Sequence, residues 1–250
     1  MTDQEIKCIP EVTIPAPCIP LFKRIQPKMV AALENQGISP EFELPMPPLE
    51  KDERCAWFIL GWVVFVNEII QNLNIILHDL VLLPHSYLPS RISPKARLHL
   101  LTRTYFYEFF RFRENLAEFL YGLRLAGVID KSERKQLLAE FSKEFEEVIQ
   151  IRNTMVHGHS KWKGEDHFLL SFATMLDNCG LYAVEKSSGT VLDLSKPLQN
   201  IVDKHVQVFH REGCKMPAVL QAITTQISEQ LLPPETSFNP DAAVSGGTAG

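Results

Sequence analysis

The chain reads Ile151-Arg152-Asn153-Thr154-Met155-Val156-His157 at the end of a long stretch with the apolar spacing of an amphipathic helix. At about 100° per residue, Arg152 falls on the apolar face of that helix. The residues within about 60° of Arg152 are Leu138, Phe141, Phe145, Val148, Ile149, Met155 and Val156. A guanidinium keeps its proton, and burying it without a partner costs several kcal/mol. Arg152 therefore requires a carboxylate, a partner subunit or a bound phosphate.

An Arg, a polar residue, three further residues and a His make up this motif, with Arg152, Asn153 and His157 at its defining positions. The motif resembles that of the HEPN superfamily (higher eukaryotes and prokaryotes nucleotide-binding), and the resemblance covers about Leu98 to His159. It implies an all-helical domain and a homodimer in which two Arg/His pairs face each other. In many members that cleft is a metal-independent endoribonuclease. Members paired with a nucleotidyltransferase antitoxin usually carry a Tyr where this chain has His159.

The resemblance implies catalytic roles for the three motif residues. His157 is expected to transfer protons, because its pKa lies near neutrality. Arg152 is expected to clamp the phosphate with its planar fork, and Asn153 to orient it through a hydrogen bond. The products would be a 2′,3′-cyclic phosphate and a 5′-hydroxyl, formed without a cofactor. Further candidate contacts to RNA are His159, Lys161, Lys163, Arg103 and Arg111.

Two other interpretations remain open from the sequence. The first is a catalytically inactive HEPN-like module that binds a nucleotide, an RNA or a protein partner such as an antitoxin. The second is a helical interaction domain in which Arg152 pairs with a core carboxylate (Glu68, Glu108 or Glu114) and His157 caps the helix. For Arg103 and Arg111 the corresponding alternative is that their aliphatic stems pack while their charged ends stay in solvent.

The composition and charge of the chain argue against several classes of function. The 250 residues carry a net charge of −5, which argues against broad, sequence-independent binding of long nucleic acid. The five Cys are scattered, which predicts reduced thiols in a cytoplasmic protein. The longest apolar run, Cys55–Val66, is too short to span a bilayer, so no membrane association is expected. His157, His159 and His167 lack a fourth ligand, and no metal site is predicted.

The predicted fold is mainly α, an antiparallel HEPN-like helical bundle over residues 51–232 with a small β-hairpin near 167–194. We expect helices at about Asp52–Leu82, Pro94–Leu125 with Ser93 as N-cap, and Lys131–Val156 with Asp130 in a capping box, followed by Pro197–Arg211 and Pro217–Leu231.

The chain ends are predicted to differ from the domain. Residues 1–50 hold nine of the 17 Pro and should form an arm that packs on the domain, with one short helix at Lys28–Asn35. The alternative is a disordered arm that binds a partner. Residues 233–250 are expected to be disordered. A polar stripe on the first long helix (Asn67, Gln71, Asn74 and His78) indicates a solvated face or, alternatively, one wall of the cleft near Arg152.

Overall fold

Helices make up most of the part of the chain that the structure, a computed structural model, describes. That part comprises residues 7–36, 46–85, 93–156, 165–179, 184, 186–191 and 195–231. The elements are a short 3-10 helix η1 (Ala16–Cys18), α1 (Ile19–Gln36), α2 (Lys51–Leu82), α3 (Pro94–Leu125), α4 (Lys131–Glu144), α5 (Glu146–Val156), α6 (Glu165–Asn178) and α7 (Ser195–Leu231). The mainly α fold class is therefore confirmed.

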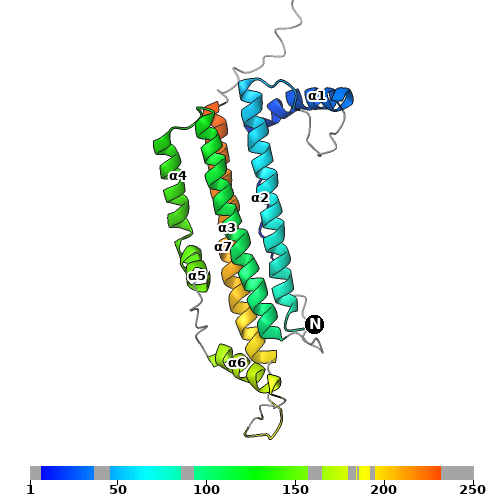
Figure 1. Cartoon of the computed structure of the whole chain (residues 1–250), viewed down its shortest axis with the longest axis vertical. Coiled ribbons are helices and arrows are strands. Elements are labelled where there is room, and N and C mark those ends of the chain that lie inside the picture. The colour runs from blue at the N-terminus through cyan, green and yellow to red at the C-terminus, as the bar shows by residue number, and fades with distance from the viewer. Residues whose placement is uncertain are drawn as a thin grey trace, which may run out of the picture.

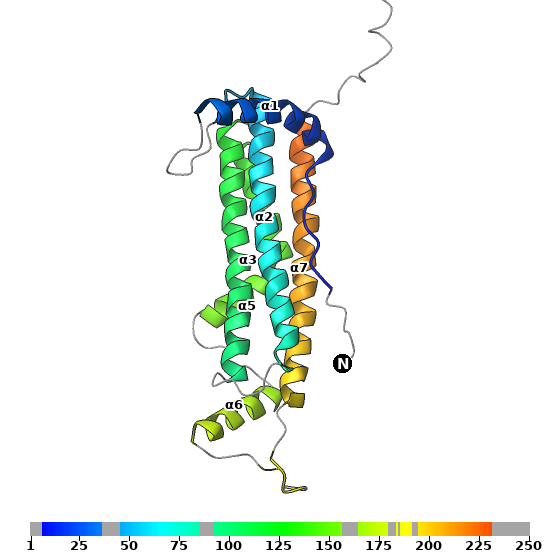
Figure 2. The ribbon, with the colours of Figure 1, turned by 90° about the vertical axis from the view of Figure 1, so that its right-hand side faces the viewer.

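The long helices α2, α3 and α7 run side by side and form the body of the molecule (Figures 1 and 2). Following the chain, α2 is antiparallel to both α3 and α7. Helices α4 and α5 run along the other flank of α3, while α1 lies across one end of the bundle and α6 across the other. Helix α3 thus contacts every later helix as well as α2.

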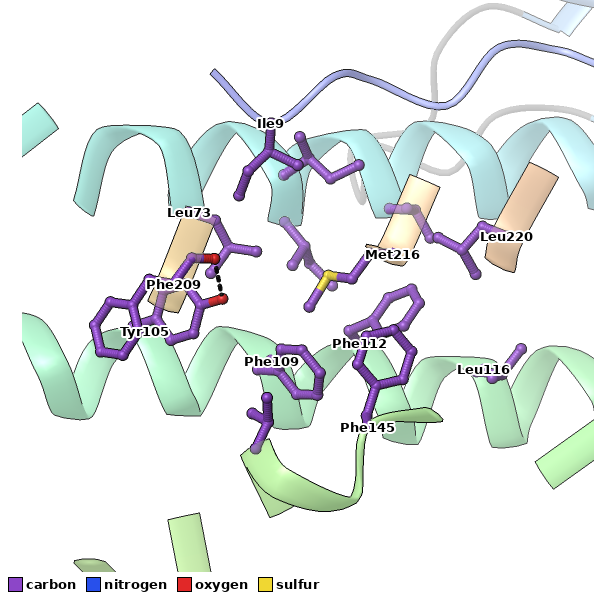
Figure 3. Close-up of a cluster of buried hydrophobic side chains, with 14 of the residues drawn as sticks. Ile9, Leu73, Tyr105, Phe109, Phe112, Leu116, Phe145, Phe209, Met216 and Leu220 are labelled. Carbon is purple, nitrogen blue, oxygen red and sulfur yellow. Dashed lines mark hydrogen bonds between the residues drawn. The ribbon is translucent and has the colours of Figure 1, made fainter. Parts of the chain in front are cut away.

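Aromatic rings fill the space between these helices. Near the α1 end, Phe119 of α3 stacks on Trp62 of α2, with ring centroids 4.1 Å apart, and also on Phe58. Toward the other end, Tyr105 stacks on Phe209 of α7 at 3.9 Å and donates a 2.8 Å hydrogen bond to the carbonyl of Phe209 (Figure 3). Burial raises the pKa of Tyr105, so its hydroxyl stays a donor.

The predicted starts of α3 and α4 are confirmed. Helix α3 begins after Ser93, whose hydroxyl accepts the backbone N–H of Ala96. Helix α4 begins after Asp130, which forms the predicted capping box with Glu133. Local side-chain chemistry at these ends was sufficient to locate them.

The predicted single helix over residues 131–156 is wrong, because it breaks at Phe145 into α4 and α5. Phe145 has φ −107° and ψ 23°, outside the helical range. Phe141, Phe145 and Val148 are buried around the break, with the Phe141 and Phe145 ring centroids 4.7 Å apart. Phe145 still donates to the carbonyl of Phe141 and accepts from the N–H of Ile149, at 3.1 and 3.0 Å, so the break is local.

The prediction of two helices after residue 195 is also wrong, because α7 continues through Pro217. Proline removes one backbone donor, and its ring crowds the carbonyl four residues earlier. The carbonyl four residues before Pro217 is that of Gly213. Met216 and Leu220, close to Pro217 in the helix, are fully buried, so packing holds this part of α7 in the core. A repeat of seven residues (Val202, Phe209, Met216 and Ile223, all buried) keeps one face of α7 in the core.

The segment from 167 to 175, expected in a β element, lies instead in helix α6. Its buried Leu170 and half-buried Thr174 are four residues apart, which is a helical spacing. In the described residues of the predicted hairpin, one isolated antiparallel bridge pairs Val184 with Val191, and Gly189 has φ +67°. No strand is described there, so the hairpin is not confirmed. The predicted tail, residues 233–250, lies outside the described residues.

The helix predicted at Lys28–Asn35 is longer than expected and begins at Ile19, with Pro27 inside it. Leu21, Ile25 and Met29 recur every four residues and are buried, mainly against α2. Lys28 contacts both carboxylate oxygens of the buried Glu53, at 2.7 and 2.6 Å. These hydrogen bonds hold the pKa of Glu53 below its ordinary value.

Residues 7–15, which we call the strap, run along α2 and α7 without regular secondary structure (Figure 2). Asn74 accepts the Ile9 N–H at 2.7 Å and donates to the Ile9 carbonyl at 3.0 Å. Asn67 holds Val12 in the same way, at 2.8 and 3.0 Å. Between them, Gln71 donates to the exposed Glu11 carboxylate. Two of the four residues of the polar stripe of α2, Asn67 and Asn74, therefore bind the backbone of the strap.

The spacing of these contacts follows from the two backbones. Asn67 and Asn74 are two helical turns apart, about 10.5 Å along α2. Three residues of extended, polyproline-type chain advance about 9 Å. Ile9 therefore reaches Asn74, and Val12 reaches Asn67. Ile9 also packs closely on Gly213 of α7, where an added Cβ would lie 2.2 Å from Ile9 Cδ1.

Helix α2 is, among the described residues, the one helix long and apolar enough to cross a membrane. A buried core helix meets the same criterion, and thirteen residues of α2 are buried in the bundle.

We predict that Asn67→Ala and Asn74→Ala each lower the free energy of unfolding by about 1–3 kcal/mol, because each leaves a backbone donor and acceptor of the strap without a partner. Denaturant unfolding followed by circular dichroism measures the change. Gln71→Ala is the matched control, since it lies between them on the same face and binds an exposed side chain. An equal loss in all three variants would contradict a specific role for the main-chain contacts.

Candidate functional site

Helix α5 carries the first half of the Arg-Asn-x-x-x-His motif and ends at Val156. Arg152 and Asn153 lie in its C-terminal part, and the Asn153 side chain is exposed. The side chain of Arg152 lies outside the described residues, as do His157, His159, Lys161 and Lys163 in full. The apolar face predicted for one helix over 131–156 assumed a constant helical rotation per residue. Because the helix breaks at Phe145, that spacing applies to α4 and to α5 separately.

Apolar contacts fix α5 against α3. Val148 is buried, and Phe145, directly before the helix, packs on Phe109 of α3 with ring centroids 5.1 Å apart (Figure 3). The side of α5 that carries Val148 faces the core, while Ile151 of the same helix remains partly exposed. The motif therefore extends from a helix whose position is set by ring packing.

Ion pairs connect this region to α7. Glu147 of α5 lies 3.2 Å from Arg211, and Glu144 at the end of α4 lies 3.7 Å from Lys215. Both cations also contact the buried Glu212, at 2.7 and 2.9 Å. Burial alone would raise the pKa of Glu212, but the hydrogen bonds from Lys215 and Arg211 outweigh it and keep the pKa low.

A pocket of about 160 Å³ lies between α3 and α5, beside the motif. Its walls are mainly aromatic and aliphatic, and two polar side chains, Arg113 and Asn153, also line it. The Arg113 guanidinium carbon lies 5.9 Å from the centre of the Phe110 ring. The remaining lining residues are Phe106, Phe109, Val148 and Ile149. The pocket thus combines flat apolar surfaces with one cation and one amide.

The two arginines expected to contact RNA differ in their surroundings. Arg103 is exposed on α3. Arg111 is engaged within the bundle, 2.9 Å from Glu108 and 3.6 Å from Glu68, and it stacks over Phe65 of α2. Glu68 and Glu108, two carboxylates considered as partners for Arg152, thus both contact Arg111.

Three histidines gather where α3, α6 and α7 meet. The ring centroids of His167 and His205 are 6.0 Å apart, and His205 also contacts the carbonyl of Ile201. Burial, followed by the neighbouring His205, lowers the pKa of His167 to about 4. Burial likewise lowers the pKa of His99, with Lys95, Arg103 and His205 adding to the effect. The cluster favours neutral imidazoles.

Comparisons with protein-family models, curated proteins and solved structures find no match to this chain. Within the described ranges, no group of three or more His, Cys, Asp or Glu side chains is placed to hold a metal ion.

Although Arg103 and Arg111 of the same helix were candidate RNA contacts, the sequence did not single out Phe110 and Arg113 as site residues. Their role depends on where α5 packs, which is a contact between distant parts of the chain. His99 and His205 were missed for the same reason, since three separate helices bring the histidines together.

We predict that the protein loses stability as the pH falls from about 6.5 to about 4, the ordinary and the folded pKa of His167. In that range the unfolded chain binds more protons than the folded one, so acid favours unfolding. Denaturant midpoints measured across this range test the expectation.

His167→Gln should flatten the pH dependence, whereas His78→Gln, which alters an exposed histidine of α2, should leave it unchanged. A stability that rises on acidification, or an equal effect of both variants, would contradict a role for the histidine cluster.

Proposed function

We propose that this chain is a metal-independent endoribonuclease of the HEPN type, acting in a toxin or defence system, with its active site formed by two copies of the chain. The observation that carries the proposal is the Arg-Asn-x-x-x-His spacing at the end of α5 in a mainly helical chain. The exposed Asn153 beside a pocket that also contains Arg113 supports it, because such a pocket suits part of a nucleotide.

In this proposal the chain cleaves RNA through its own side chains. His157 takes the proton from the 2′-hydroxyl or gives one to the leaving 5′-oxygen, and the His157 of a second copy performs the other transfer. Arg152 stabilises the charge on the phosphate, since its fork contacts two oxygens at once. Asn153 orients the phosphate. The attacking 2′-oxygen displaces the 5′-oxygen, which leaves a 2′,3′-cyclic phosphate and a 5′-hydroxyl.

A catalytically inactive module that binds a nucleotide is the second candidate. The engagement of Arg111 with Glu108 and Glu68 favours it, because these ion pairs remove one expected cation from the RNA-binding set. The acidic net charge of −5 points the same way. Such a module would use the pocket beside Asn153 without turnover.

We predict that the wild-type chain cleaves single-stranded RNA in the presence of EDTA and leaves 2′,3′-cyclic phosphate ends. His157→Ala should lower the rate by about 10²-fold or more, the scale of general acid–base catalysis. Arg152→Lys should restore little of the activity lost in Arg152→Ala, because Lys cannot contact two phosphate oxygens in one plane. Gel analysis of end-labelled RNA measures both.

Lys186→Ala, a change at an exposed residue outside the proposed site, is the control and should cleave like wild type. Cleavage that disappears on chelation, or that survives His157→Ala undiminished, would leave the inactive module as the better account.

We also predict a two-fold homodimer with an interface of at least about 1,200 Å², since one chain supplies only one His and one Arg from the motif. Ile151, partly exposed on the motif helix, should lie in or near that interface. Ile151→Glu should therefore shift the protein toward monomer in sedimentation velocity, whereas Ile19→Glu on α1 should not. A wild-type monomer at tens of micromolar would contradict the composite site.

A further inference from the structure

The pocket between α3 and α5 has the features of a binding site for a single flat ring. We propose that it holds one unpaired nucleobase of single-stranded RNA, next to the phosphate that the motif acts on. This assignment rests on the proposed function, and it adds the class of RNA that the site accepts. The walls of the pocket and its polar rim support this assignment.

The walls provide surfaces for stacking. Phe110 is half-buried on α3, and Val148 and Ile149 line the pocket from α5. Phe106 and Phe109, both almost fully buried, also line it. Every nucleobase has a π-face, and stacking on aromatic side chains is the usual way in which proteins hold bases splayed out of single strands.

The polar residues supply what a base and its phosphate require. Asn153 carries an amide with donors and an acceptor, the combination that pairs with a base edge. Arg113 is exposed above Phe110 and keeps its charge, so it suits the phosphate attached to that base. Asn153 also belongs to the motif, which connects the base in the pocket to the neighbouring reacting phosphate.

The lining of the pocket favours an unpaired base, because its aromatic and aliphatic walls contact the faces of a ring. A base in a duplex would have to leave its stack to enter, which costs a few kcal/mol. A single strand or a loop has no such cost, so the site should select RNA with an unpaired base at the cleavage position.

Fluorescence anisotropy of the full-length His157→Ala protein in EDTA tests this, with a labelled short single-stranded RNA and the same strand annealed to its complement. Binding should favour the single strand. Adding Phe110→Ala should weaken it about tenfold through the loss of stacking. Adding Arg113→Ala should weaken it and reduce the slope of log affinity against log salt by about one. Phe168→Ala, which removes an exposed ring on α6, is the matched control and should not change it.

The outcomes separate the pocket from the catalytic proposal. Three results would overturn the pocket assignment: equal affinity for duplex and single strand, an affinity unchanged by Phe110→Ala, or no binding of RNA. Cleavage by the wild type with an unchanged KM in Phe110→Ala would overturn the pocket alone. Single-strand binding that depends on Phe110, without cleavage by the wild type, would overturn the nuclease alone. Competition by adenosine 5′-monophosphate at an affinity equal to that of the RNA would assign the pocket to free nucleotides instead.

Discussion

Burial of α3 on several sides is the constraint on which the rest of the structure depends. A helix that contacts five others needs apolar side chains around most of its circumference, and α3 meets this need with aromatic rings. The ring of Phe119 packs on α2, that of Tyr105 packs on α7, and that of Phe109 packs on the segment around Phe145. Because each ring faces a different neighbour, the positions of those neighbours are coupled through one helix.

The candidate site follows from that coupling. Helix α5 is short, and eleven residues alone would form a marginal helix in water. Its place depends on Val148 and the preceding Phe145 on one side and on the pairing of Glu147 with Arg211 on another. The pocket exists only because α5 lies there, since both helices contribute its walls. Local packing, more than the motif itself, therefore determines what could bind beside Asn153.

The sequence predicted the features that local chemistry controls. Ser93 and Asp130 marked helix starts, and the apolar spacing of α2 and α3 gave their lengths. It failed at Phe145, where the backbone leaves the helical range, and at Pro217, where buried neighbours accompany a continuous α7. For the site, the sequence supplied the motif residues, but Phe110 and Arg113 could be recognised only once α5 was packed on α3.

The strap has a consequence for which substitutions the chain can accept. Asn67 and Asn74 contact main-chain atoms of the strap, so an exposed side chain between them, such as that of Pro10, is open to wide variation. One restriction falls on the buried side chains of Ile9 and Val12, and another falls on backbone chemistry. Proline occupies neighbouring positions freely, but at position 9 or 12 it would remove the N–H that an asparagine receives. Divergent sequences could thus keep the same strap provided that positions 9 and 12 hold apolar residues that also carry a backbone N–H.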